Sequence, residues 1–178
     1  MSEAEGSWNY PAEYPIAART LQALLDRAEE FVREDMKEIR LPVNPKANED
    51  TTPRPFDVMK MALDDPEDWE GRIPYILIQL LNGKDQEEDA TAKLRFIICL
   101  YNRDRAAGKM ALVHAVQKLR FDLLRAGTLG NEFVLRKPLE FLFINDDTGA
   151  YHLAEIHATY SLPEIEREIV GLHDGYYQ

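Results

Sequence analysis

Apolar residues recur at helical spacing in two stretches of the chain. In residues 16–40 they follow one another at intervals of three and four, with charged side chains between them, which predicts an amphipathic helix that Leu41-Pro42 stops. Residues 109–126 repeat this spacing, and Gly127 directly after them predicts a C-terminal cap. The predicted buried stripe of the second helix consists of Leu112, Val113, Val116, Leu119, Leu123 and Leu124.

Other stretches have the patterns of strands. Residues 92–101 alternate between two faces, one of them apolar throughout, and give the clearest strand prediction in the chain. Residues 73–82 are apolar on both faces, which predicts a central, covered strand. Residues 56–63 give no clean period and are assigned to a strand. Residues 133–135, 139–144 and 151–160 form the predicted final strands. Asn82-Gly83 with the charged residues 84–89, and the turn residues 145–149, predict two hairpins.

The remaining segments connect or flank these elements. Residues 1–15 hold two prolines and predict an extended arm, whereas the proline-rich residues 42–55 predict a loop and residues 64–70 an acidic turn. Residues 164–170 are expected to form one or two helical turns, and residues 171–178 a tail. The order of elements predicts one α+β domain over residues 16–170. It has a mostly antiparallel sheet of five to six strands with two main helices packed on one face.

The charge distribution narrows the range of partners. The 178 residues have a net charge of -11, and the middle of the chain, residues 71–130, is its one basic part, with ten basic and six acidic side chains. A chain this acidic is a poor candidate for binding nucleic acid through its phosphates, so we expect no sequence-specific nucleic-acid partner. No apolar run approaches the ~20 residues that span a bilayer. The N-terminus lacks the pattern of a signal peptide, which predicts synthesis in the cytoplasm and no membrane partner.

A search of the sequence for catalytic and metal-binding patterns yields none. There is no phosphate-binding glycine loop, and Cys99 lies in an apolar run that predicts core packing rather than nucleophilic chemistry. His152 and His157 are five apart on a predicted strand, so they point to opposite faces and do not ligate one metal together. The clustered carboxylates fall in predicted turns, which are usually solvated. We therefore expect no cofactor, no metal and no catalytic residue.

A set of segments, taken in order, resembles a known family of structural proteins. They are residues 74–83, the alternating strand ending at Leu100-Tyr101, residues 112–116, residues 127–135, residues 138–141 and residues 154–163. Over about residues 56–165 the chain resembles the tail terminator, or tail-completion, proteins of long-tailed bacteriophages and related particles. The long acidic N-terminal part departs from that pattern.

The resemblance implies a small non-enzymatic α+β subunit of the virion that is synthesised and assembled in the bacterial host cytoplasm. It implies a ring, usually of six copies, on the head-proximal end of the tail tube, which ends tube polymerisation and joins the neck or connector. In a contractile tail the ring also meets the sheath protein. The implied partners are therefore other copies of the chain, the tail tube protein, the neck protein and, in contractile tails, the sheath.

Two charged loops are the candidate interface with a neighbouring subunit or with the tube. They flank the predicted hairpin and the second helix and hold the local charge contrast. Their candidate residues are Lys84, Asp85, Glu87, Arg103, Arg105 and Lys109. Two other functions stay open: a monomeric acidic binding or inhibitor protein of mobile-element origin, and a small hydrolase that uses loop carboxylates.

Overall fold

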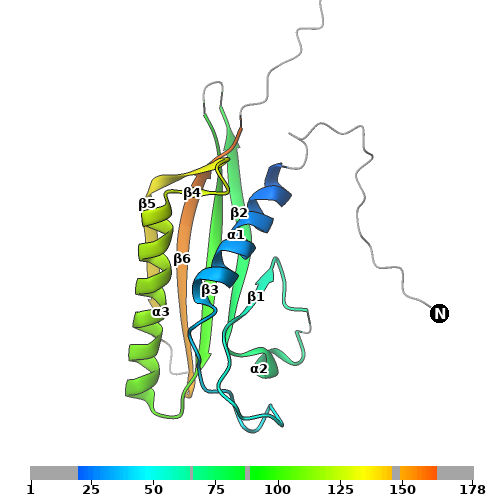
Figure 1. Cartoon of the computed structure of the whole chain (residues 1–178), viewed down its shortest axis with the longest axis vertical. Coiled ribbons are helices and arrows are strands. Elements are labelled where there is room, and N and C mark those ends of the chain that lie inside the picture. Colours follow the sequence, from blue (N-terminus) through cyan, green and yellow to red (C-terminus); the bar gives the residue numbers. More distant parts are fainter. Residues whose placement is uncertain (1–19, 65, 87–88, 146–148, 164–178) are drawn as a thin grey trace, which may run out of the picture.

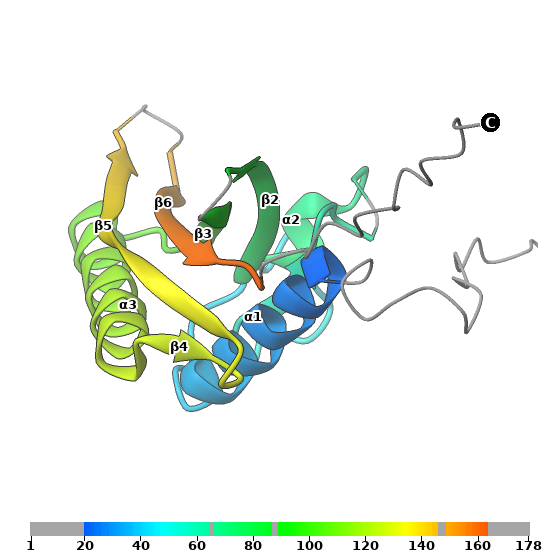
Figure 2. The same cartoon turned by 90° about the horizontal axis from the view of Figure 1, so that it is seen from above.

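A six-stranded sheet with the two long helices on one face makes up the structure (Figures 1 and 2). The computed structural model describes residues 20–64, 66–86, 89–145 and 149–163. Its helices are α1 (Thr20–Met36), α2 (Trp69–Arg72) and α3 (Arg105–Ala126), and its strands are β1 (Asp57–Lys60), β2 (Tyr75–Asp85), β3 (Ala90–Tyr101), β4 (Thr128–Leu129), β5 (Phe133–Ile144) and β6 (Tyr151–Ser161). The strand order is β1-β2-β3-β6-β5-β4. Each neighbouring pair is antiparallel except the parallel pair β1 and β2, which confirms the predicted α+β fold.

The main core lies between the sheet and the helices α1 and α3. Alternate residues of β3, from Ala92 to Leu100, are fully buried, and β6 alternates in the same way. Helix α1 adds Leu24 and helix α3 adds Leu119, both with no exposed surface. The strand and helix periods therefore present most of their apolar residues to one shared core, as the sequence predicted. In the predicted stripe of the second helix, however, Val113 and Leu124 are only half-buried, and Ala115 is buried instead.

The opposite face of the sheet holds a smaller apolar cluster at one end. Tyr75, Leu77 and Cys99 are buried there with Tyr101. The loop of residues 42–55 lies near this end, because the Asn44 side-chain amide donates a 2.7 Å hydrogen bond to the Tyr151 hydroxyl. The burial of Tyr75–Ile78 on both faces confirms the predicted covered strand for the first half of β2, whereas residues 81–85 are exposed.

The local sequence signals misplaced several element boundaries. Asn82-Gly83 is not a turn, because β2 continues through both residues to Asp85 and the chain reverses after it. The register shifts between Leu80 and Asn82, and this irregularity explains a turn-like dipeptide inside a strand. Helix α1 ends at Met36 rather than at residue 40, because Leu41 instead pairs with Arg54 across the base of the loop.

Some elements were not predicted at all or were divided wrongly. The short helix α2 lies within the predicted acidic turn and its flank, and β4 directly follows Gly127. The predicted strands 133–135 and 139–144 form one strand, β5, with a register irregularity between Arg136 and Glu140, next to Pro138. The predicted arm, C-terminal helical turns and tail lie outside the described residues.

Candidate interaction surface

The candidate interface residues lie at opposite ends of the sheet. Lys84 and Asp85 are exposed near the end of β2, where they pair with the first residues of β3. Arg103, Arg105 and Lys109 follow the other end of β3 and are also exposed. Strand β3 has 12 residues, so at about 3.3 Å per residue the two groups are separated by roughly 35 Å. They do not form one site; Glu87 lies outside the described residues.

Helix α3 begins four residues before its predicted start because Asp104 caps it. The Asp104 carboxylate accepts a 3.0 Å hydrogen bond from the backbone N–H of Ala107, and Asn102 accepts one from the backbone N–H of Asp104. At the other end Gly127 has a left-handed φ of 67°, and its N–H bonds the carbonyl of Leu123. The predicted glycine cap is confirmed, and the earlier start places Arg105 in the first turn of the helix.

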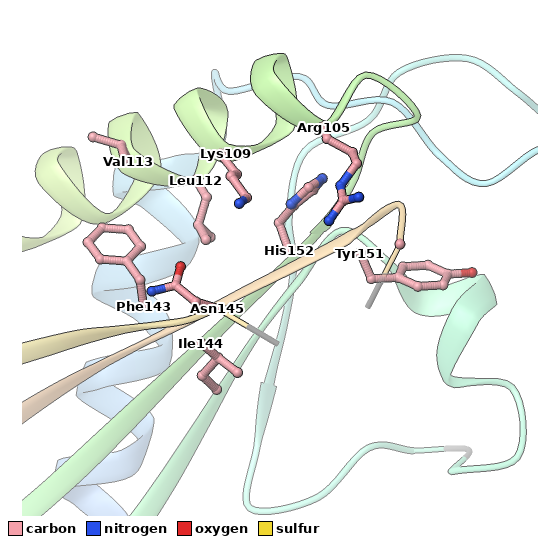
Figure 3. A pocket seen from close by; sticks show the side chains of 10 residues that line it. Arg105, Lys109, Leu112, Val113, Phe143, Ile144, Asn145, Tyr151 and His152 are labelled. Carbon is pink, nitrogen blue, oxygen red and sulfur yellow. The ribbon is translucent and has the colours of Figure 1, made fainter. Parts of the chain in front are cut away.

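A cleft of about 180 Å³ lies between the start of α3 and the adjoining ends of β5 and β6 (Figure 3). Arg105 and Lys109 are one helical turn apart and line it, together with the buried His152. Nε2 of His152 lies 3.3 Å from the carbonyl oxygen of Asn102, and because a carbonyl only accepts, the Nε2–H group is the hydrogen-bond donor. The described residues that line the cleft include no carboxylate and no thiol. The described lining of the cleft is therefore basic, with Arg105 and Lys109 beside His152.

The thiol of Cys99 and the imidazoles of His152 and His157 lie in surroundings typical of structural residues. Cys99 is fully buried, as predicted, and burial raises the pKa of its thiol to about 12 even though Tyr75 hydrogen-bonds it. His152 and His157 alternate with opposite burial on β6, which confirms that they face opposite sides. No group of three or more potential metal ligands is found among the described residues. Likewise, no helix in the described part of the chain has both the length and the apolar character that crossing a membrane requires.

A carboxylate pair that the sequence did not reveal joins α1 to α3. The Lys118 ammonium donates to Asp35 at 2.7 Å and to Asp122 at 2.8 Å. Burial raises the pKa of Asp35, whereas the hydrogen bond from Lys118 lowers the pKa of Asp122. Because one lysine binds both carboxylates, the arrangement is an ion cluster that fastens two helices together. Residues 35 and 118 are 83 apart, so no local pattern indicates their contact.

The outer edge of β5 is open along most of its length. On this edge β5 pairs with β4 at Phe133 and Val134, and among the described residues no strand lies beside residues 136–144. Phe141 on this strand is 47% exposed, and Leu142 is exposed as well. An open edge of this kind offers unpaired backbone groups to another chain, and exposed large apolar residues beside it favour protein contact.

Helix α3 flanks this edge and adds cations and further exposed apolar residues. Phe121 is 56% exposed with the Arg125 guanidinium 5.6 Å from its ring centroid, and Arg120 lies 5.5 Å from the ring of Phe141. Arginine and aromatic residues together are typical of the centre of protein interfaces. Helix α3 and strand β5 together carry seven cations and two carboxylates. Of these cations, Lys118 and Arg125 contact Asp122, and Arg136 contacts Asp89. We call this surface the β5 side, and it consists of Met110, Arg120, Phe121, Arg125, Phe141 and Leu142.

No protein-family model matches the chain, and a search of curated proteins finds no match to it.

Proposed function

We propose that this chain is a non-enzymatic structural subunit that assembles as a ring on the head-proximal end of a phage or phage-like tail tube. The ring ends tube polymerisation and joins the tail to the neck, and in a contractile tail it also contacts the sheath. The observation that carries the proposal is the β5 side: an open strand edge with exposed aromatic residues beside a cationic helix, in a chain of net charge -11.

Several features of the structure support a role in assembly. The α+β architecture agrees with the fold expected from the resemblance to tail terminator proteins. Copies of an acidic chain repel one another, so their association requires a surface of opposite charge. The cationic α3 supplies such a surface. The exposed charges at the two ends of the sheet, Lys84 and Asp85 at one and Arg103 at the other, suit contacts with two successive layers of a tail.

Charge reversal at the α3 end tests the proposal. We expect the double variant Arg103→Glu/Arg105→Glu to weaken self-assembly at least tenfold, because it removes two exposed cations from an acidic chain. Circular dichroism and thermal unfolding should show a folded monomer, and light scattering would measure the assembly. The matched control is Lys37→Glu/Arg40→Glu, which reverses two exposed cations beyond the end of α1.

Two outcomes of this comparison would contradict the proposed role. Unchanged assembly of the Arg103→Glu/Arg105→Glu variant would reject the contribution of this end of α3. Equal weakening by the control pair would mean that net charge alone governs association. Capping is tested separately, by adding the protein to growing tubes of a tail tube subunit and measuring tube length by electron microscopy. Tubes that keep growing at the same rate would reject tail termination.

A further inference from the structure

The β1 edge of the sheet, opposite to the β5 side, carries the opposite charge. Strand β1 is the first strand in the sheet order, and the segment that follows it leads into α2. Met61 in this segment is 48% exposed and Trp69 in α2 is 36% exposed. We call this surface the α2 side, and it consists of Met61, Asp64, Glu67, Asp68, Trp69 and Glu70.

The α2 side is acidic. The described residues between 57 and 72 carry five carboxylates and two cations, Lys60 and Arg72. Lys60 already contacts Asp26 and Glu29 of α1, at 2.5 and 2.8 Å. Arg72 lies 3.4 Å from Asp57 and 3.9 Å from Asp64. The nearby cations are therefore engaged within the chain, and the surface keeps an excess of negative charge around its two exposed apolar residues.

Met61 follows the strand at the β1 edge, opposite to the open edge of β5, whereas Trp69 of α2 reaches over the end of the sheet and packs on Tyr151 of β6, with ring centroids 5.1 Å apart. Four strands, β2, β3, β6 and β5, separate β1 from the far edge, and neighbouring strands are about 4.8 Å apart. Figures 1 and 2 both show α3 and β5 on one side of the sheet and α2 on the other. Each copy of the chain therefore presents a cationic, aromatic edge in one direction and an acidic edge in the other.

We propose that the β5 side of one copy binds the α2 side of the next copy. This inference rests on the proposed ring, and it names the surfaces that form the ring contact. Opposite charge favours this pairing over contacts between two identical sides, because those would place like charges together. A contact between two different surfaces is heterologous, and it repeats from copy to copy until the ring closes. The exposed Phe121 and Phe141 would then be covered by the segment that holds Met61 and Trp69.

Mixing two complementary variants tests this pairing directly. Arg125→Glu alters the β5 side, and Asp68→Lys alters the α2 side; both residues are exposed, and the Asp68 side chain makes no capping hydrogen bond to α2. We expect each variant alone to associate at least tenfold more weakly than the wild type. An equimolar mixture should form a 1:1 complex, because the Arg125→Glu copy keeps an intact α2 side and the Asp68→Lys copy keeps an intact β5 side. Sedimentation velocity would measure both results.

Matched controls reverse one charge of the same sign in the segment that follows α1. Arg40→Glu and Glu49→Lys make the same changes in net charge as the two test variants at exposed positions on neither surface, and they should associate as the wild type does. Wild-type association of Arg125→Glu and Asp68→Lys would overturn the pairing, and so would a mixture that stays as weak as its components. A wild type that stays monomeric at every concentration would overturn it as well.

Different results would reject the pairing of these two surfaces and the proposed function. A wild-type ring that survives both substitutions leaves the proposed ring in place and rejects these surfaces. A ring that both substitutions disrupt, but that does not stop tube growth, supports the surfaces and rejects tail termination.

Discussion

Helices α1 and α3 cover the same face of the sheet, yet their charged residues are used differently. Each buries an apolar stripe in one shared core. On α1 the acidic residues pair with cations of the same chain; Glu29, for example, lies 2.6 Å from Arg33 and 2.8 Å from Lys60. On α3, Lys118 and Arg125 also contact Asp122 of the same helix, at 2.8 and 3.2 Å. In addition, Arg120 and Arg125 lie over the rings of Phe141 and Phe121, which are themselves exposed. We infer that the outer face of α1 serves the fold, whereas that of α3 serves assembly.

The largest expected loss of stability comes from truncating a core leucine, and it tests whether α1 and α3 contribute equally to the core. Leu24 on α1 and Leu119 on α3 have no exposed surface. Replacing either with alanine leaves a cavity in a close-packed core, so we expect each variant to lose about 2 to 5 kcal/mol of unfolding free energy. Urea denaturation would measure both losses. A loss below about 1 kcal/mol in one of them would mean that its helix is not needed to close the core.

A smaller effect should appear at the point where α3 approaches β6. A Cβ added at Gly108 would lie 2.2 Å from Nε2 of the buried His152. We expect Gly108→Ala to destabilise the chain by about 1 to 3 kcal/mol, because the clash outweighs the helix propensity of alanine. Thermal and urea unfolding would measure the loss.

The matched experiment makes the same substitution in a His152→Ala background. There the clash is absent, and Gly108→Ala should stabilise the chain by up to about 1 kcal/mol. An equal destabilisation in both backgrounds would show that the ring of His152 does not limit how closely α3 packs against β6.

The smallest effect concerns the charges on α1. Burial opposes ionisation of Glu29, but hydrogen bonds from Lys60 and Arg33 outweigh it and lower its pKa below the ordinary value of 4.5. A carboxyl whose pKa is lowered on folding adds stability above its ordinary value, and this stability disappears as the pH falls through the folded pKa. Glu29→Gln should therefore cost less than about 1 kcal/mol at pH 7 and almost nothing at pH 3.

Urea denaturation at both pH values checks this dependence, and Glu132→Gln, at an exposed position, is the control. A cost for Glu29→Gln that is equal at pH 7 and pH 3 would show that the charge of Glu29 does not stabilise α1.

The sequence predicted the parts of the fold that follow from local periodicity. The alternation of residues 92–100 placed β3 with the correct buried face, and the 3.6-residue period located both main helices. Errors arose where tertiary contacts override local signals. Asn82-Gly83 stays in β2 because the strand continues to pair with β3 beyond it, and the chain leaves the helical path after Met36, before Leu41 pairs with Arg54.

The candidate site was less accessible to prediction. The exposed cations of residues 103–109 were evident from the sequence, but their roughly 35 Å separation from Lys84 depends on the length of the whole of β3. The β5 side was missed because Phe141 reads as an ordinary strand residue, and its exposure follows from the position of β5 near the edge of the sheet. The contact of Lys118 with Asp35 likewise requires the packed structure.

The most direct test of the proposed ring is the solution mass of the wild-type protein, measured by light scattering across a concentration series. The account predicts a mass that rises with concentration and levels off at a closed ring of about six copies, visible by electron microscopy. A mass that stays at one copy at every concentration, and also in the presence of the tail tube subunit, would contradict it.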